Sequence, residues 1–274
     1  MATRLDSVNV DCADAEALGR WWASTLDWPI VRHEWTDGRR TTFEFSVDPP
    51  HGRPGVSLTF ANVAEGKVGF NRVHVDLRSG SASEQVAMVV ALEQRGARRI
   101  DIGQGDVPFV VLADPEGNEF CVLDRRDDYE HTGQIAAIVM KALDPISLAP
   151  FWSAATGWDV VVSTPGYAAL EDQRQPGPLL ELIATNESHR VKNRWHLDVR
   201  PDTSSDRDVE VGRLLDLGAT RVEVGQAYAA PGEVTWVVLA DPEGNEFCVL
   251  RGIDEPKARA VLRQHHRVGG SPDR

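Results

Sequence analysis

The sequence lacks the features of a secreted, membrane-spanning or nucleic-acid-binding protein. It has three cysteines among 274 residues, and it contains no apolar run long enough to span a bilayer. The N-terminal segment MATRLDSVNVDC includes no apolar stretch of the kind found in signal peptides. Acidic residues outnumber basic ones by 42 to 29 without any long basic cluster, which argues against nucleic acid and anionic membranes as partners. We therefore expect a cytoplasmic protein.

Common catalytic motifs are also missing. The chain has no glycine-rich phosphate loop, no serine nucleophile elbow, and no HExxH or CxxC sequence. Its composition, 42% hydrophobic and 26% charged, is that of an ordinary globular protein. Any chemistry must therefore come from residues that the fold brings together.

The chain does contain a long internal repeat. Val111–Leu123 and Val238–Leu250 both read VLADPEGNEFCVL, and Asn71–Arg78 (NRVHVDLR) closely matches Asn193–Arg200 (NRWHLDVR). Each copy of the repeat spans roughly 130 residues, the size of an ordinary domain. Two of the cysteines hold the same place in the two copies, which is not the pattern of a disulfide framework. The sequence therefore predicts two tandem domains in a reducing compartment.

Each half of the chain has the pattern of a strand, a helix and three strands, given twice. At the first helix, Asp14 stands at the cap position, and Leu18 and Trp22 recur at the spacing of one helical face. In the first half we expect helices over Ala15–Leu26 and Ala82–Arg95, and strands at Ser7–Asp11, Trp28–Trp35, Thr41–Val47, Val56–Ala61, Arg72–Arg78, Arg98–Ile102, Val107–Leu112 and Glu119–Leu123.

The second half follows the same plan and sets the domain boundaries. Asp144 and Pro145 suit the cap and first turn of a helix over Ile146–Thr156. The charged stretch Arg125–Gly133 has no apolar periodicity and is expected to be a linker. The predicted organisation is a first domain at 1–126, a second domain at 133–252, and a tail at 253–274 with a short helix over Glu255–His265 and a flexible end.

These repeated modules, with a DPxGN turn leading into the last strand, resemble the vicinal oxygen chelate (VOC) superfamily. That superfamily includes glyoxalase I, bleomycin-resistance proteins and extradiol dioxygenases. The GNEFCVL segment and the strand with His and Asp look most like its glyoxalase-like branch, and the resemblance covers nearly the whole chain. It implies an α+β fold of two tandem VOC domains. In each, two βαβββ modules would form an open, curved-sheet barrel with the helices outside and a pocket on the concave face.

The resemblance also indicates where metal ligands would lie. Metal-dependent members place up to four ligands on the first and last strands of each module. In this chain those positions fall at Ser7, Ser57, His74 and Cys121 in the first half, and at Ala137, Glu181, His196 and Cys248 in the second. Because catalytic metal sites normally need three protein ligands, the first half is not expected to hold a metal.

Strand alternation predicts which other side chains share a face with these positions. On the repeated strand, Asp76 and Arg78 lie on the face of His74, and the second copy repeats this arrangement. The His and Asp side chains could move protons and orient a polar ligand. A structural alternative is an internal Asp–Arg ion pair, Asp76 with Arg78 and Asp198 with Arg200, beside a hydrogen-bonded histidine.

The leading hypothesis is a protein of the glyoxalase and bleomycin-resistance type that binds a small organic molecule. It needs no obligatory metal, and its pocket lies mainly in the second domain. Trp35 and Trp236 lie on strands and could stack on a flat ligand, whereas Trp22, Trp28, Trp152 and Trp158 are expected in the core. The candidate ligand-binding residues are His74, Glu119, Glu181, His196, Trp236 and Cys248, and the candidate catalytic residues are His196 and Glu246.

The alternative hypothesis is a metal-dependent lyase or isomerase of the glyoxalase type. Glu181, His196 and Cys248 would hold one divalent ion such as Zn, Ni, Mn or Fe in the second domain, with Glu246 as the base. A further alternative makes the first domain only a packing partner of the second. The expected quaternary state is a monomer with intrachain domain pairing or a homodimer.

Overall fold

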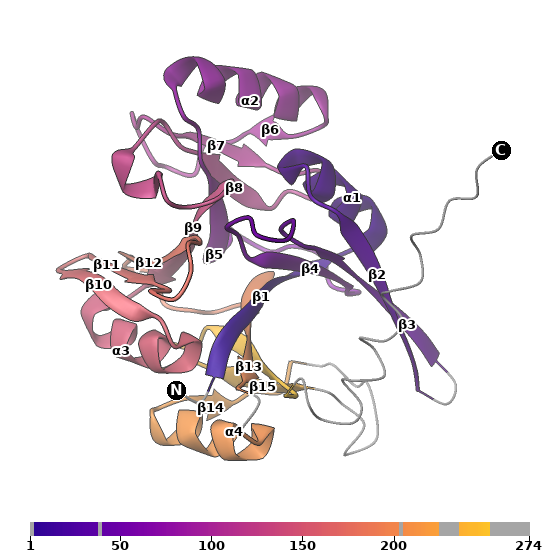
Figure 1. The fold of residues 1–274 in the computed structure, drawn as a ribbon, viewed down its shortest axis with the longest axis vertical. Helices are drawn as coiled ribbons and strands as arrows, with labels where there is room; N and C mark the ends of the chain where they lie inside the picture. The colour runs from indigo at the N-terminus through magenta and orange to yellow at the C-terminus, as the bar shows by residue number, and fades with distance from the viewer. Residues whose placement is uncertain (1–2, 38–39, 203–204, 225–235, 253–274) are drawn as a thin grey trace.

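The computed structural model describes residues 3–37, 40–202, 205–224 and 236–252 (Figure 1). The short helix expected over Glu255–His265 and the tail around it lie outside the described residues. None of the helices in the described ranges is long and apolar enough to cross a membrane.

Four modules of one strand, one helix and three strands follow one another along the chain. The first comprises β1 (Thr3–Cys12), α1 (Ala15–Leu26), β2 (Ile30–Asp37), β3 (Arg40–Val47) and β4 (Ser57–Asn62). The second comprises β5 (Val73–Leu77), α2 (Ala82–Gln94), β6 (Arg98–Arg99), β7 (Val110–Ala113) and β8 (Glu119–Val122). After the 3-10 helix η1 (Asp127–Tyr129), the third comprises β9 (Ile135–Ala142), α3 (Pro145–Thr156), β10 (Asp159–Thr164), β11 (Tyr167–Glu171) and β12 (Leu179–Ala184). The fourth comprises β13 (Trp195–Pro201), α4 (Arg207–Asp216), β14 (Thr220–Arg221), β15 (Trp236–Ala240) and β16 (Glu246–Leu250).

Capping residues determine where the helices α1 and α3 begin and where α3 ends. Asp14 caps α1 by accepting a hydrogen bond from the backbone N–H of Ala17, and Asp144 caps α3 in the same way. Pro145 occupies the first turn of α3, where its missing N–H is not needed. Gly157 ends that helix with a φ of 74°, a left-handed conformation that favours glycine. The α+β fold class and the tandem arrangement are thus confirmed.

The strand order joins the modules differently from the expectation. The first sheet has the order β14-β15-β16-β13-β1-β4-β3-β2, so it combines the first and fourth modules. The second sheet has the order β10-β11-β12-β9-β5-β8-β7-β6 and combines the second and third modules. Antiparallel pairs of leading strands, β1 with β13 and β5 with β9, join the modules at the sheet centres. The two open sheets are therefore each shared by one module from the first half of the chain and one from the second.

One hydrophobic core lies between the helices and both sheets. Val8 and Val10 of β1 point into it, and Trp22 of α1 is fully buried there. The Trp22 ring packs edge-to-face on Phe120 of the second sheet and on Trp195 of the first, with centroids 5.1 and 5.6 Å apart. The four tryptophans expected in the core are all buried, which confirms that expectation: Trp22, Trp28, Trp152 and Trp158.

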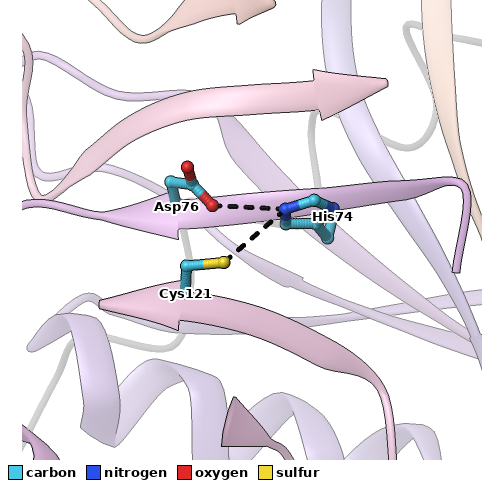
Figure 2. A group of neighbouring side chains, drawn as sticks. All are labelled: His74, Asp76 and Cys121. Carbon is cyan, nitrogen blue, oxygen red and sulfur yellow. Dashed lines mark hydrogen bonds and ion pairs between the residues drawn. The ribbon is translucent and has the colours of Figure 1, made fainter. Parts of the chain in front are cut away.

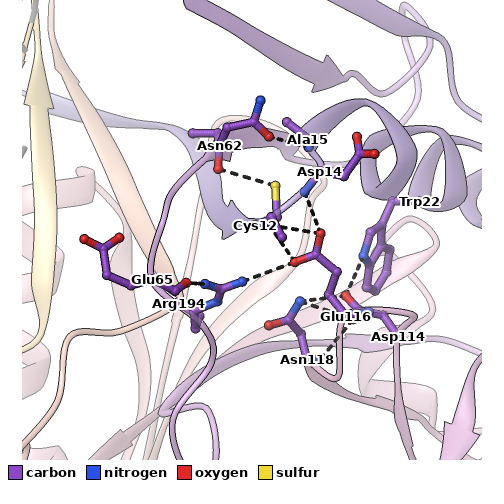
Figure 3. A network of polar contacts seen from close by, with 12 residues as sticks. Cys12, Asp14, Ala15, Trp22, Asn62, Glu65, Asp114, Glu116, Asn118 and Arg194 are labelled. Carbon is purple, nitrogen blue, oxygen red and sulfur yellow. Dashed lines mark hydrogen bonds and ion pairs between the residues drawn. The ribbon is translucent and has the colours of Figure 1, made fainter.

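Each of the identical DPEGN turns joins the two modules of its half across the two sheets, and Figure 3 shows the first of them. The Glu116 carboxylate accepts hydrogen bonds from the backbone N–H groups of Ala13 and Asp14, at 2.8 and 2.9 Å, just before α1. Asp114 accepts a hydrogen bond from Nε1 of Trp22 at 3.3 Å and another from the side chain of Asn118.

The second copy repeats these bonds. Glu243 accepts from the N–H groups of Leu143 and Asp144, and Asp241 accepts from Nε1 of Trp152. We call the bonds of each copy a turn–helix clip. The clip gives a physical reason for the Asp, Glu and Asn that the two turns share, because each of these side chains has a hydrogen-bond partner.

Removing one turn glutamate tests the clip. Glu116→Ala and Glu243→Ala are each expected to lower the free energy of unfolding by about 1–2 kcal/mol, because two backbone N–H groups lose a charged acceptor. Urea unfolding followed by circular dichroism measures the change. Glu16→Ala removes an exposed carboxylate from α1 and should stay within about 0.5 kcal/mol of wild type. Equal effects at Glu16 and Glu116 would show that the clip contributes nothing.

Candidate functional site

The face of the first sheet that points away from the core carries small polar side chains. Because side chains alternate along a strand, the neighbours of Val8 and Val10 point to this face. The register aligns its residues in rows: Cys248, Asp198, Ser7 and Ser57; then His196, Asn9, Thr59 and Ser46; then Asp11, Ala61, Glu44 and His33. We call this set the polar face. Its members on β1 and β13 are buried.

His196 lies between an acid and a thiol at the centre of the polar face. Its Nε2 is 3.5 Å from Oδ1 of Asp198 and 3.5 Å from Sγ of Cys248. Burial raises the pKa of Asp198 to about 6, although the nearby His196 acts in the opposite direction. Burial and then the charge of Asp198 raise the pKa of the Cys248 thiol. The thiol is therefore protonated at neutral pH, which makes it a poor nucleophile in this environment.

Two buried oxygen atoms on the polar face accept no hydrogen bond from the described part of the chain. They are Oδ1 of Asn9 and Oδ1 of Asp198, whose residues are 9% and 5% exposed. The other oxygen of Asp198 accepts a long hydrogen bond, 3.4 Å, from the Ser7 hydroxyl. Buried polar atoms nearly always have partners, so these two oxygens indicate a place for one.

Carboxylates crowd one end of the polar face. Burial, followed by the charges of Asp198 and Asp11, raises the pKa of the half-buried Glu44 to about 8. Asp11 itself is paired with Nζ of Lys192 at 2.5 Å. His33 contributes a hydrogen bond of 2.8 Å between its Nε2 and the Ser46 hydroxyl.

The second sheet holds an equivalent trio in different surroundings (Figure 2). Nε2 of His74 lies 3.3 Å from Oδ1 of Asp76 and 3.8 Å from Sγ of Cys121. Apolar side chains around this trio form a second hydrophobic cluster with the linker residue Tyr129. The members of that cluster are Val111, Cys121, Leu123, Tyr129, Ala136, Ala137, Val139 and Leu179.

Glu181 belongs to this second sheet. It accepts hydrogen bonds from the hydroxyls of Tyr129 and Tyr167, at 2.6 and 3.0 Å. Burial raises the pKa of Glu181, although these hydrogen bonds oppose the change. Tyr129 of the linker thus packs on this face of the second sheet and binds Glu181, a role that the charged sequence of the linker did not predict.

The structure does not bring the predicted metal set together. His196 and Cys248 meet on the first sheet, but Glu181 lies on the second, so the three cannot form one site. The crossing of modules between the sheets is the reason. The register corrects a second expectation. Glu181 pairs with Val139 as Thr59 pairs with Asn9, so Glu181 holds the position of Thr59 and not that of Ser57.

The candidate base Glu246 serves as an anchor for a loop. Oε2 of Glu246 accepts the backbone N–H of Asn193 and lies 3.1 Å from Nε2 of His189. Burial acts to raise the pKa of Glu246, but these hydrogen bonds outweigh it and lower the pKa. Glu119 is held in the same way by Lys67 and the N–H of Asn71. These contacts favour a structural role for both glutamates.

Two further expectations have different outcomes. The expected Asp–Arg ion pairs are not found among the described residues: Arg200 pairs with Asp6 at 2.7 Å, and Arg78 donates to the carbonyl oxygens of Tyr129 and Glu130. Trp236 is half-buried on β15, and by alternation it lies on the side of the polar face. The side chain of Trp35 lies outside the described residues.

The sequence did not single out Asn9, Glu44 or Tyr129. Asn9 and Glu44 stand at the polar positions of alternating strands, a pattern that is also typical of a solvated face. Their alignment with His196 and Asp198 depends on pairing between the first and fourth modules. No signal in the sequence specifies that pairing.

Comparison with known proteins supports the fold. A family model described as "Glyoxalase-like domain" matches residues 7–123 and 137–250. Glyoxalase I from Zea mays is 15% identical, with a TM-score of 0.65 over 97% of each chain. A candidate dioxygenase from Bacillus subtilis subsp. subtilis str. 168 is 12% identical, with a TM-score of 0.62 over 99% of this chain and 97% of its own. Among curated proteins, no sequence is similar enough to count as a match.

The raised pKa of Glu44 predicts how stability depends on pH. A carboxyl that holds its proton more tightly in the folded state destabilises the fold when it ionises, here as pH rises from about 4.5 to about 8. The free energy of unfolding should therefore fall over this range, and Glu44→Gln should reduce the fall by about 1 kcal/mol or more. The groups around Glu44 are Asp198, Asp11, Lys192 and His33.

Urea unfolding at pH 5, 6, 7 and 8 measures this dependence. Glu34→Gln is the matched control, because Glu34 is on the neighbouring strand β2 with its side chain about half exposed. It should leave the pH dependence unchanged. An identical slope in wild type and Glu44→Gln would contradict the raised pKa.

Proposed function

We propose that this chain, which belongs to the glyoxalase-like domain family of the VOC superfamily, binds a small organic molecule on the polar face of its first sheet. The observation that carries the proposal is a pair of buried oxygens that accept no hydrogen bond, Oδ1 of Asn9 and Oδ1 of Asp198, the second of which has the His196 ring 3.5 Å away. Leaving a buried polar atom without a partner costs about 1–3 kcal/mol. A ligand with N–H or O–H groups removes that cost.

The proposed site draws on both ends of the chain. β13 and β16 supply His196, Asp198 and Cys248, while β1 supplies Ser7 and Asn9. His196 is the group suited to hold or move a proton at the ligand, since its imidazole lies at the centre of the face. The second sheet also has a buried Oδ1, that of Asp76, which accepts no hydrogen bond, but Tyr129 and apolar side chains cluster around its trio, so the proposal gives it no ligand.

A ligand screen with two histidine variants tests this proposal. Among metabolites screened by thermal shift, some are expected to stabilise the wild-type protein, by about 2.7 kcal/mol for a ligand at 100 times its Kd. His196→Ala should abolish that stabilisation because it removes the central imidazole. His74→Ala removes the equivalent imidazole from the second sheet and should retain it.

Trp236→Ala extends the same test. The indole lies on the side of the polar face, so its loss should weaken binding of flat ligands. Stabilisation that survives both His196→Ala and Trp236→Ala would place the ligand elsewhere and contradict the proposal.

A second candidate function is metal-assisted lyase or isomerase chemistry at His196, Asp198 and Cys248. The distances from Nε2 of His196 to the other two ligand atoms, 3.5 Å each, fit the separations of roughly 3.3–3.6 Å expected around a tetrahedral zinc ion. The unsatisfied Oδ1 of Asp198 also suits such an ion. A bound divalent ion would supply polarisation of the ligand's oxygens, while His196 and Asp198 would hold it in place.

Elemental analysis of the purified protein before and after chelation tests the second candidate. About one tightly held transition metal per chain, lost in His196→Ala and retained in Glu181→Ala, would favour it. Under the leading proposal, the chelated protein keeps its ligand-induced stabilisation. Loss of that stabilisation on chelation, with recovery on adding metal back, would replace the leading proposal by the second candidate.

A further inference from the structure

The charges on the polar face indicate what kind of ligand fits it. Its described carboxylates are Asp11, Glu44 and Asp198, and Asp11 is already paired with Lys192. Asp198 is offset by His196, whose Nε2 lies 3.5 Å from it, and by the charge of Arg200. Glu44 faces the negative charges of Asp198 and Asp11, and no ion pair of Glu44 is found among the described residues. Glu44 is therefore the carboxyl group of this face without a matching positive charge.

The unsatisfied atoms have the same polarity as these charges. Oδ1 of Asn9 and Oδ1 of Asp198 are both hydrogen-bond acceptors, and each belongs to a residue at least nine-tenths buried. A molecule that satisfies them must bring hydrogen-bond donors. Donors and positive charge are combined in protonated amines and guanidinium groups.

The spacing of the two carboxylates favours an organic group over a bare metal ion. Glu44 is on β3 and Asp198 is on β13, three strand positions apart in the sheet order and four residues apart along the strands, so their backbones are offset by about 14 Å across the strands and about 13 Å along them. One metal ion cannot contact ligands so far apart unless the side chains converge completely. The side chains on the diagonal between them, Asn9 and Thr59, are small, so an extended molecule would meet little steric obstruction there.

The second sheet provides an internal contrast. Lys141 holds the position there that Asp11 holds in the first sheet, and Val139 holds that of Asn9. The second sheet has carboxyl groups of its own, Asp76 and Glu181, but Glu181 accepts hydrogen bonds from two tyrosine hydroxyls and lies near Arg126, partners that Glu44 lacks among the described residues.

We infer that the polar face selects an organic cation, a molecule with a protonated amine or guanidinium group that lies over Asn9 between Glu44 and Asp198. Asn9 accepts one of its N–H donors, and the bound cation favours the ionised form of both carboxyl groups, which then balance its charge. This inference rests on the proposed function and names the ligand class for the same site. Glu44 is a specificity residue in it, and His196 keeps its central place.

Matched probes test the inference. Phenylethyl, cyclohexylethyl and indolylethyl frames are each used as the amine, the alcohol and the carboxylate, and their Kd values are measured by ligand-observed NMR at pH 7. Site-dependent binding is defined as binding lost in His196→Ala and kept in His74→Ala. Among site-dependent probes, the amines should bind at least tenfold more tightly than the alcohols of the same frame.

Two glutamine variants isolate the charge. Glu44→Gln should reduce the preference for amine over alcohol to within about threefold, while the affinity of the alcohol stays unchanged. Glu34→Gln, on the neighbouring strand, should keep the full preference. Thermal melts of both variants confirm that they are folded.

The outcomes distinguish failure of the cation inference from failure of the proposed function. Site-dependent alcohols or carboxylates that bind as tightly as the amines overturn the cation inference and leave the proposed function in place. A preference for amines that is equal in wild type and Glu44→Gln also overturns it. If none of the probes binds in a site-dependent way, the proposed function fails and the inference fails with it.

Discussion

The fold depends on the hydrogen bonds between each DPEGN turn and the start of a helix. The turn joins two strands of one sheet, and the helix follows a strand of the other sheet. Because the two modules of one half lie in different sheets, none of the described strands of one module pairs with a strand of the other. The turn–helix clip and the tryptophan behind it provide that link: Glu116 binds the N–H groups before α1, and Asp114 binds the Trp22 indole. The same bonds recur in the second half. A turn with so many partners tolerates little change, which gives the thirteen-residue identity a physical basis.

Local structure could be read from the sequence because it depends on local chemistry. The cap at Asp14, the helical spacing of Leu18 and Trp22, and the alternation around Val8 predicted α1 and β1 within a few residues. The choice of partner strands could not be read in the same way. Backbone hydrogen bonds join strands whatever their side chains, and the four leading strands have similar alternating patterns. The sequence therefore predicted the modules and their order but not which modules share a sheet.

The candidate site was likewise predictable where it depends on one module and not where it depends on the pairing of modules. His196 and Cys248 were predicted to share a site, and they lie side by side because both are on adjacent strands of one module. Glu181 was grouped with them because the family resemblance placed a ligand position of the same domain there, and the crossing of modules removes it from the site. Asn9 and Glu44 enter the site from the first module, more than 150 residues away in sequence. Such long-range neighbours become visible only when the sheet order is known.

The crossing also affects the order in sequence: the strands of the second sheet all lie between the two parts of the chain that form the first sheet. The second sheet is built from the continuous stretch 73–184, whereas the first sheet needs residues at both ends, such as Ser7 and Asp198, which are 191 residues apart. During synthesis the second sheet can be completed while the last module is still unmade, and β1 must wait for β13. Contacts of such long sequence separation are closed late and slowly. The binding face is thus assembled only by a full-length chain, so that truncated products carry the apolar sheet but lack the polar one.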